Sequence, residues 1–182
     1  MHRYDKLSQE FIDALHSPTP DFGKARDLLQ QGVDINTGAP EDYSTLLTES
    51  IAFLIDDYGE TATPEDLGNA LVSIVRFFLE NGYDVSRCDR KYGALALWQL
   101  MFSIETDHIL EAAKLLLAAG ADSSVILDPE EKEDVAEQFF IEADFQYSCK
   151  WNDNLGNIFQ ALAELLLNSQ EIKGDGDGNY KD

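Results

Sequence analysis

Three shortages narrow the classes of protein to which this chain can belong: it has little cysteine, few basic residues and no long apolar run. Cysteine occurs twice, as Cys88 and Cys149, and the spacing fits neither a metal site nor a redox pair. A fold held together by disulfides is therefore not expected, and both thiols are expected to stay reduced, as they do in the cytosol.

The sequence predicts neither a membrane-spanning segment nor a secretory signal. The longest strongly apolar stretch, 115–121, is far too short to span a bilayer. The polar residues 1–6 are not followed by the apolar segment of a secretory signal. We therefore expect a cytoplasmic protein with no membrane partner.

Basic residues are scarce, because Lys and Arg number 13 against 35 Asp and Glu, for a formal net charge of −22. Nucleic acids and anionic membranes attract basic surfaces, so neither is an expected partner. The charge fits a basic protein partner, bound cations or simple solubility.

The length and composition are those of one globular domain. A chain of 182 residues that is 44% apolar can bury a substantial core. Residues 174–182 are dominated by glycine and aspartate and read as a solvated tail. We expect a single domain over 1–173 and an acidic, Gly-rich tail over 174–182.

Apolar residues recur at helical spacing through most of the chain. A capping residue followed by proline and acids, as at Thr63-Pro64 and Asp128-Pro129, is typical of a helix start. The segment 17–20 interrupts the first helical pattern, and Pro20 suits the first turn of the next helix. The predicted helices, which form four pairs, span 4–15, 20–31, 44–55, 64–81, 92–103, 107–119, 128–145 and 154–168.

One phrase occurs three times, at 28–36, 78–86 and 116–124: an apolar helix end, a glycine, and an aspartate two residues later. The glycine of each phrase is expected to end a helix in the left-handed conformation, which glycine adopts without steric penalty. The aspartate is expected to accept backbone hydrogen bonds in the turn that leads to the next unit. A repeated phrase of this kind indicates a stack of similar structural units.

The repeated units differ in length. Gly32 and Gly82 are 50 residues apart, whereas Gly82 and Gly120 are 38 apart. In the last unit Gln170 stands where a fourth glycine would fall. A terminal repeat allows this, because no further unit stacks on it.

The phrase Gly-x-Asp-(Val/Ile)-(Asn/Ser) after a helix rich in alanine and leucine resembles the ankyrin repeat, over about residues 20–124. Downstream, 89–93 resembles the β-turn finger of that repeat. The segment 94–97 stands where the family has Thr-Pro-Leu-His. The segment 45–48 is the most similar to that motif. The helix residues that match the family are Ala25, Leu28, Leu29, Ala113, Leu116 and Leu117.

The spacing of the units departs from the family's period of about 33 residues, which implies extended loops or helices. The fold that we expect is all-α: an α-solenoid of about four helix pairs, ankyrin-like with irregular repeat lengths. A generic α-solenoid is the alternative.

The resemblance implies a binding module, because ankyrin proteins usually contact partners through their finger tips and inner helix face. Tyr92 and Trp151 could instead pack over the next helix, as large aromatic residues often do. Trp98 stands where the family places a buried histidine and is expected in the core. Carried over by position, the partner-binding residues are Asp42, Tyr43, Arg90, Lys91, Tyr92, Lys150, Trp151, Asn152 and Asp153.

Motifs for catalysis or cofactor binding are not found in the sequence. The histidines match no metal-binding motif, and His108 with Glu111 is only half of a possible site. Neither a Gly-rich phosphate loop nor a Gly-x-Ser-x-Gly elbow is present. The tail 175–179 begins like a calcium loop, but Tyr180 replaces the glycine that the turn needs. We expect no catalytic residues, no metal and no cofactor.

The segment 128–144 carries eight acids and a single lysine, Lys132, with apolar residues between them at helical spacing. One interpretation is a solvated face over a core face. The other is an electrostatic surface for a basic partner, whose association would be fast and sensitive to salt.

These observations favour a monomeric, non-catalytic module that binds a protein, and the charge favours a basic one. An immunity-type inhibitor of a basic toxin or nuclease is a sharper alternative that would use the same charge. An enzyme with a cryptic acidic site and an acidic mimic of nucleic acid are the remaining hypotheses.

Overall fold

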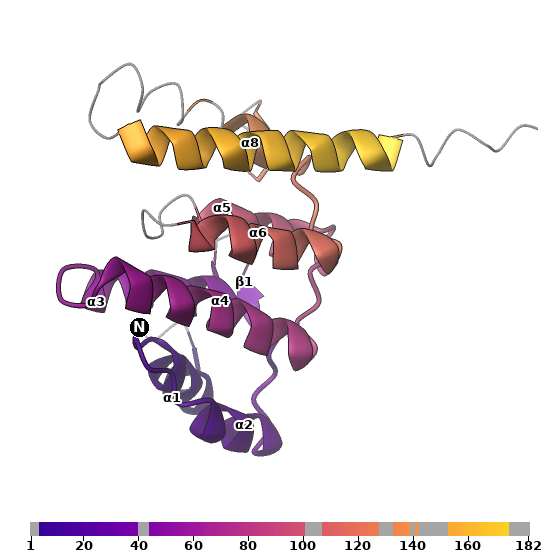
Figure 1. Ribbon diagram of the computed structural model, residues 1–182. Helices are drawn as coiled ribbons and strands as arrows, with labels where there is room; N and C mark the ends of the chain where they lie inside the picture. The colour runs from indigo at the N-terminus through magenta and orange to yellow at the C-terminus, as the bar shows by residue number, and fades with distance from the viewer. Residues whose placement is uncertain are drawn as a thin grey trace, which may run out of the picture.

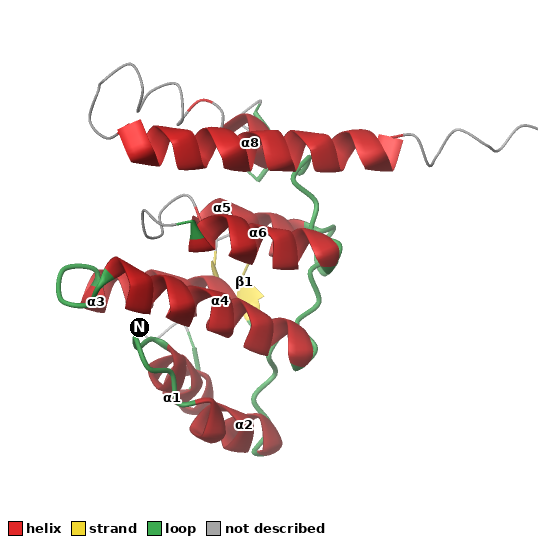
Figure 2. Cartoon of the chain, viewed as in Figure 1, coloured by secondary structure: helices red, strands yellow, loops and turns green. Residues whose placement is uncertain are grey.

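The computed structural model describes residues 4–39, 44–100, 107–127, 133–138, 141 and 153–174 (Figure 1). The regular structure in this part of the chain is helical apart from one short β-ribbon, as Figure 2 shows, so the prediction of an all-α fold is confirmed. The elements are α1 (Lys6–Leu15), α2 (Phe22–Gln30), β1 (Gly38–Ala39), β2 (Ser44–Thr45), α3 (Leu46–Tyr58), α4 (Pro64–Glu80), α5 (Lys91–Gln99), α6 (His108–Ala118) and α8 (Asp153–Gly174).

The helices form pairs that lie in layers (Figure 1). Helix α1 packs on α2, α3 on α4 and α5 on α6. Neighbouring pairs are joined by contacts of α1 with α3, of α3 with α5 and of α4 with α6, and α8 lies on α6. None of the helices in the described ranges is long and apolar enough to cross a membrane.

The starts of the helices follow from their capping residues. Thr63 accepts a hydrogen bond from the Asp66 N–H, and Pro64 takes the first helical position, as predicted. The start predicted at Pro20 is wrong, because Asp21 caps α2 by accepting from the Lys24 N–H. Pro20 therefore lies before the cap.

The capping residues also set the bounds of the later helices. Thr45 forms a capping box at the start of α3, which runs to Tyr58, beyond the predicted end. Helix α8 runs from Asp153 to Gly174 and is longer than predicted. Of the predicted helix at 128–145, the residues 135–138 are helical, and most of the others lie outside the described residues.

The repeated phrase has the same structure in all three units, as predicted. In the first, the Gly32 N–H donates to the Leu29 carbonyl (3.1 Å) and the Val33 N–H to the Leu28 carbonyl (3.2 Å). This pair of bonds defines the Schellman motif, which requires a left-handed residue after the helix. The glycine φ angles are 108° at Gly32, 93° at Gly82 and 98° at Gly120. The equivalent bonds are Gly82–Leu79 with Tyr83–Phe78, and Gly120–Leu117 with Ala121–Leu116.

The connections between pairs differ in structure. After α2, the antiparallel strands β1 and β2 form a two-residue ribbon with Gly38 opposite Thr45. The expected finger at 89–93 is instead a turn that leads directly into α5. Three residues of this turn have left-handed backbones, namely Cys88 (φ 53°), Asp89 (φ 55°) and Arg90 (φ 70°). Such conformations are uncommon outside glycine, so tertiary contacts must hold this turn in place.

An aromatic cluster fills the core where the first two pairs meet. The ring of Phe11, from α1, lies 5.6 Å from that of Phe78, edge to face, and Phe78 lies 5.7 Å from Tyr83 in the same way. Edge-to-face contacts of this kind favour aromatic packing beyond the burial of area alone. The cluster joins α1 to α4 and to the turn that follows α4.

Candidate partner-binding surface

Four of the residues predicted to bind a partner belong to the described ranges. Arg90, Lys91 and Tyr92 lie at the start of α5, and Asp153 begins α8. The other five, Asp42, Tyr43, Lys150, Trp151 and Asn152, lie outside the described residues.

Arg90 is held in place by a buried carboxylate. Its Nη1 donates to Oδ2 of Asp122 at 2.8 Å, and the side chain of Asp122 is only 4% exposed. The other oxygen of Asp122 accepts from the N–H (3.1 Å) and hydroxyl (2.7 Å) of Ser124. The Arg90 side chain remains 67% exposed, so it can support the third phrase and still meet a partner.

The prediction that Tyr92 contacts a partner is wrong, because Tyr92 is 1% exposed. Its hydroxyl donates to the Asn36 carbonyl (3.0 Å), and its own carbonyl accepts from the Tyr83 hydroxyl (3.1 Å). The Arg87 guanidinium covers the ring at 5.7 Å from its centroid. Tyr92 packs between units, which was the alternative interpretation of this residue.

The aspartate of each phrase organises its turn, as predicted. The Asp34 carboxylate accepts from the Asn36 N–H (2.9 Å), and the Asp84 carboxylate accepts from the Ser86 N–H (2.9 Å) and hydroxyl (2.6 Å). The hydrogen bonds from Ser86, chiefly that of its hydroxyl, hold the pKa of Asp84 below its ordinary value. Burial raises the pKa of the neighbouring Tyr83 phenol, which therefore stays protonated.

Asn36 joins the first two units through both ends of its amide. Its Nδ2–H donates to the Gly82 carbonyl (3.0 Å), and its Oδ1 accepts from the Asp84 N–H (2.7 Å). Arg87 adds an ion pair with Asp34 at 3.6 Å between two partly exposed side chains. Since the turns of both phrases are tied together, this edge of the stack is a fixed surface.

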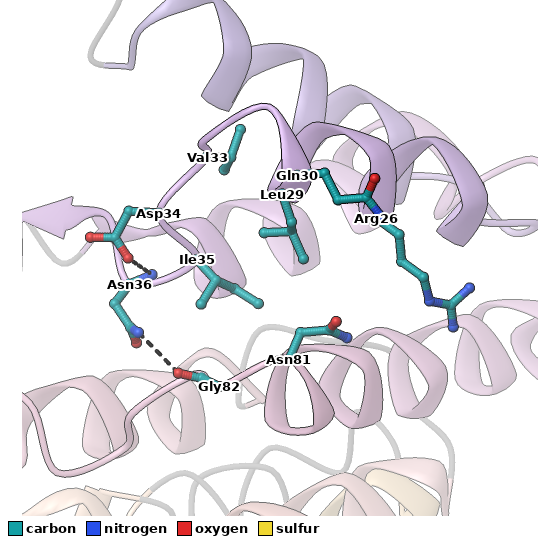
Figure 3. Close-up of a pocket in the computed structure, with 9 residues that line it drawn as sticks. All are labelled: Arg26, Leu29, Gln30, Val33, Asp34, Ile35, Asn36, Asn81 and Gly82. Atoms are coloured by element: carbon teal, nitrogen blue, oxygen red, sulfur yellow. Dashed lines mark hydrogen bonds between the residues drawn. The ribbon is translucent and has the colours of Figure 1, made fainter.

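A groove of about 540 Å³ lies beside these turns, where α2 and α4 end (Figure 3). Leu29, Val33 and Ile35 contribute apolar surface to it, and polar side chains and backbone line the rest. Figure 3 shows Asp34 and Asn36 at one end and the Arg26 guanidinium at the other. The lining residues, which we call the α2–α4 groove, are Arg26, Leu29, Gln30, Val33, Asp34, Ile35, Asn36, Asn81 and Gly82.

Sequence reasoning missed this groove because it depends on the placement of two helices rather than on one segment. Phe22 on α2 stacks on Phe77 of α4 with ring centroids 5.1 Å apart. Arg26, one turn later, lies over the same Phe77 ring at 5.6 Å. The groove opens beyond these contacts, toward the ends of the two helices. The only signal in the sequence was the repeated phrase at its rim.

A cluster of acidic residues lies in the connection between α3 and α4. The segment 56–66 holds five exposed acids and no Lys or Arg. Histidines from neighbouring pairs flank it: the His16 Nε2 lies 3.3 Å from Asp57, and the His108 Nε2 lies 3.9 Å from Glu65. This acidic tip, defined by residues 56–66, is joined to both the first and the third pair.

The described residues contain no group of three or more His, Cys, Asp or Glu side chains that could hold a metal ion. His108 and Glu111, the half of a possible metal site noted in the sequence, have different neighbours. Glu111 pairs with Arg76 at 3.2 Å, while His108 packs against Gly68. Cys88 is exposed and has a free thiol.

Comparisons with known proteins add no family to these observations. The chain matches no model of a protein family, no curated protein and no solved structure.

Proposed function

We propose that this protein is a non-catalytic interaction module, an ankyrin-like solenoid that binds a basic protein partner. The observation that carries the proposal is that the repeated phrase has the same backbone structure in all three of its copies, and that the helix pairs between the copies stack on one another. Stacks of this kind present extended surfaces to other proteins, since each unit adds its exposed side chains to those of its neighbours.

The turn, finger and inner-helix face is the proposed partner surface. Arg90 supports this assignment, since its guanidinium is fixed on Asp122 yet largely exposed, and arginines are frequent interface anchors. Lys91 lies beside it at the start of α5. Without Tyr92, the proposed surface consists of Asp42, Tyr43, Arg90, Lys91, Lys150, Trp151, Asn152 and Asp153.

A basic partner is proposed from the charge. The net charge is −22, and the acidic tip places five carboxylates together without an intervening Lys or Arg. Complementary charge speeds the encounter of two proteins and makes their association sensitive to ionic strength, because the Debye length is about 8 Å at physiological salt.

Two carboxylates of the described residues have structural roles. The pKa values of Asp5 and Asp84 are both lowered by hydrogen bonds from serines. These two groups therefore stay ionised at neutral pH and act in a helix cap and a turn.

An immunity-type inhibitor of a basic toxin or nuclease is the second candidate. The exposed acidic tip favours it, because such an inhibitor must face a basic surface built to bind phosphates. Its expected outcome is tight binding to the product of a neighbouring toxin-like gene, and failure to bind any basic neighbour at low salt would exclude it.

The test of the proposed function is affinity capture with the immobilised full chain from native lysate, followed by mass spectrometry. We expect a basic protein that is retained at 50 mM NaCl and released as the salt concentration rises. A variant with Asp56→Asn and Glu60→Gln in the acidic tip should retain less of it. If no protein is retained at low salt, the proposed function is wrong.

A further inference from the structure

We propose that the α2–α4 groove binds an arginine side chain presented by an exposed segment of the protein partner. The inference rests on the proposed function, but it uses a different surface from the turn and inner-helix face. Its basis is the combination of an apolar floor, hydrogen-bond acceptors and two helix ends of negative polarity in one groove.

The size and lining of the groove suit a long side chain with an apolar stem. Its volume of about 540 Å³ falls within the range of roughly 300–1,000 Å³ that is usual for ligand sites. Leu29, Val33 and Ile35 can cover the methylene groups of such a stem, since long basic side chains pack these groups on apolar surfaces. The remaining space admits the residues on either side of the arginine.

Arg26 and Asp34 lie at opposite ends of the groove, and the electrostatics favour a cation at the Asp34 end (Figure 3). Helices α2 and α4 both end here, at the caps Gln31 and Asn81. A helix C-terminus carries about half a negative charge, which a Lys or Arg in the last turn commonly offsets. Neither helix has a basic residue in its last turn. Asp34 adds a full negative charge at the same end.

The acceptors in the groove are held in place before any partner arrives. Asn81 donates its Nδ2–H to the Phe77 carbonyl at 2.7 Å, which turns its Oδ1 toward the groove (Figure 3). The Asp34 carboxylate is oriented by the Asn36 N–H, and Asn36 is fixed in turn by Gly82. A guanidinium presents five N–H donors in one plane, which suits oxygen acceptors that are held in place in this way.

The arginines of the chain itself leave this end of the groove accessible. The Arg26 guanidinium lies over the Phe77 ring, away from Asp34 in Figure 3. Arg87 does approach Asp34, but at 3.6 Å and with side chains that are 43% and 59% exposed. Exposed pairs of this kind are weak and exchange readily with solvent. A second guanidinium can therefore share the carboxylate.

The experiment is a ¹⁵N NMR titration of the full chain, in 150 mM NaCl, with the peptide acetyl-(Gly-Arg)₃-amide. Matched peptides carry lysine or citrulline in place of arginine, and citrulline has nearly the shape of arginine without its charge. We expect saturable shifts of the Asn36, Asn81 and Gly82 amides with the arginine peptide, smaller ones with lysine and none with citrulline.

Two substitutions locate the site. Asp34→Asn keeps an oxygen that can accept from the Asn36 N–H, so the turn is preserved while the charge is lost. It should weaken binding roughly three- to tenfold, as expected for the loss of a charge-assisted hydrogen bond. Asp27→Asn, an exposed position on α2 that does not line the groove, is the control and should change the affinity less than twofold. Leu29→Arg, which places a guanidinium in the groove, should abolish the shifts while the rest of the spectrum is kept.

Several results would overturn the inference. Equal weakening by Asp34→Asn and Asp27→Asn, equal binding of the citrulline peptide, or shifts spread evenly over the acidic tip would show general attraction rather than a site. Capture of a basic protein that is unaffected by Asp34→Asn and Leu29→Arg would refute the groove and leave the proposed function standing. Specific binding of the peptide without capture of any basic protein would refute the proposed function instead.

Discussion

The Tyr92 hydroxyl donates a hydrogen bond to the backbone carbonyl of Asn36, which lies 56 residues earlier in the chain. The amide of Asn36 at the same time binds the backbone of Gly82 and of Asp84. Three successive units are therefore tied together around one asparagine, and each bond crosses a boundary between units. In a stack of repeats, such bonds couple the folding of one unit to that of the next.

Tyr92→Phe should lower the stability of the whole stack by about 1 kcal/mol, because the Asn36 carbonyl loses its buried donor while the ring keeps its packing. Urea denaturation would measure the change as a lower midpoint with an unchanged slope. Tyr58→Phe, at the half-buried end of α3, is the matched control and should have a smaller effect. Equal losses in the two variants would show that the Tyr92 bond contributes nothing particular.

Gly82→Ala should destabilise the protein by about 1–2 kcal/mol, because a side chain in the left-handed region meets its own backbone. A Cβ atom at Gly82 would find no other atom within 4 Å, so the loss is purely conformational. Gly82→Asn should cost less, since asparagine tolerates this conformation better than alanine. Thermal unfolding compares the two variants, and an alanine variant as stable as the asparagine variant would contradict the argument.

The helix ends that are marked by a capping residue or by a glycine of the repeated phrase could be predicted from the sequence, because their causes are local. The cap at Thr63 and the left-handed glycines of the three phrases depend on a few adjacent residues, and the structure confirms them. The start at Pro20 failed even at this level, because Asp21 is the better capping residue and moves the helix forward.

The positions that the sequence could not predict depend on contacts between distant segments. Tyr92 follows a turn and resembles an exposed finger residue, yet Asn36 and Tyr83 from preceding units enclose it. The α2–α4 groove has the same origin, since it exists only where the ends of two helices from different units come together. The spacing of apolar residues within one segment predicts neither the burial of Tyr92 nor the presence of the groove.

The Asp122–Arg90 pair offers a test of a buried carboxylate whose partner is exposed. Asp122→Asn keeps an acceptor for the Ser124 N–H but loses the charge, and we expect a loss of about 1 kcal/mol, since the exposed Arg90 can be solvated. Asp122→Ala removes the turn as well and should cost about 2 kcal/mol. Urea denaturation of both variants checks this order, and equal losses would mean that the turn contributes nothing.

The depressed pKa of Asp84 predicts how pH acts on its turn. Because the folded-state pKa lies below the ordinary value of 3.8, ionised Asp84 stabilises the fold above that value. The contribution is lost as the pH falls below 3.8 through the lower folded pKa. Ser86→Ala removes the hydroxyl, the largest cause of the shift, so the midpoint of Asp84 should rise toward 3.8. NMR titration of the Asp84 carboxyl measures it, and an unchanged midpoint in the variant would contradict this cause.

Gly68 and His108 form a contact between α4 and α6 that leaves no room for a methyl group. A Cβ atom at Gly68 would lie 2.4 Å from the Nδ1 atom of His108 and 2.5 Å from its Cγ atom. Glycine inside a helix costs about 0.5–1 kcal/mol relative to alanine, so we infer that the close approach of α6 requires it. Gly68→Ala should therefore destabilise the protein by about 1–3 kcal/mol, although alanine favours the helix.

A double-mutant cycle separates this clash from the loss of the His108 side chain itself. In a His108→Ala background the imidazole ring is gone and the remaining Cβ atom of residue 108 lies 3.0 Å from the added methyl group, so Gly68→Ala should cost clearly less than it does beside His108. The smaller loss is the prediction, because general damage to α4 would give the same loss in both backgrounds. Since α4 and α6 belong to successive pairs, a smaller loss would also establish that the packing of one unit on the next determines the residue at position 68.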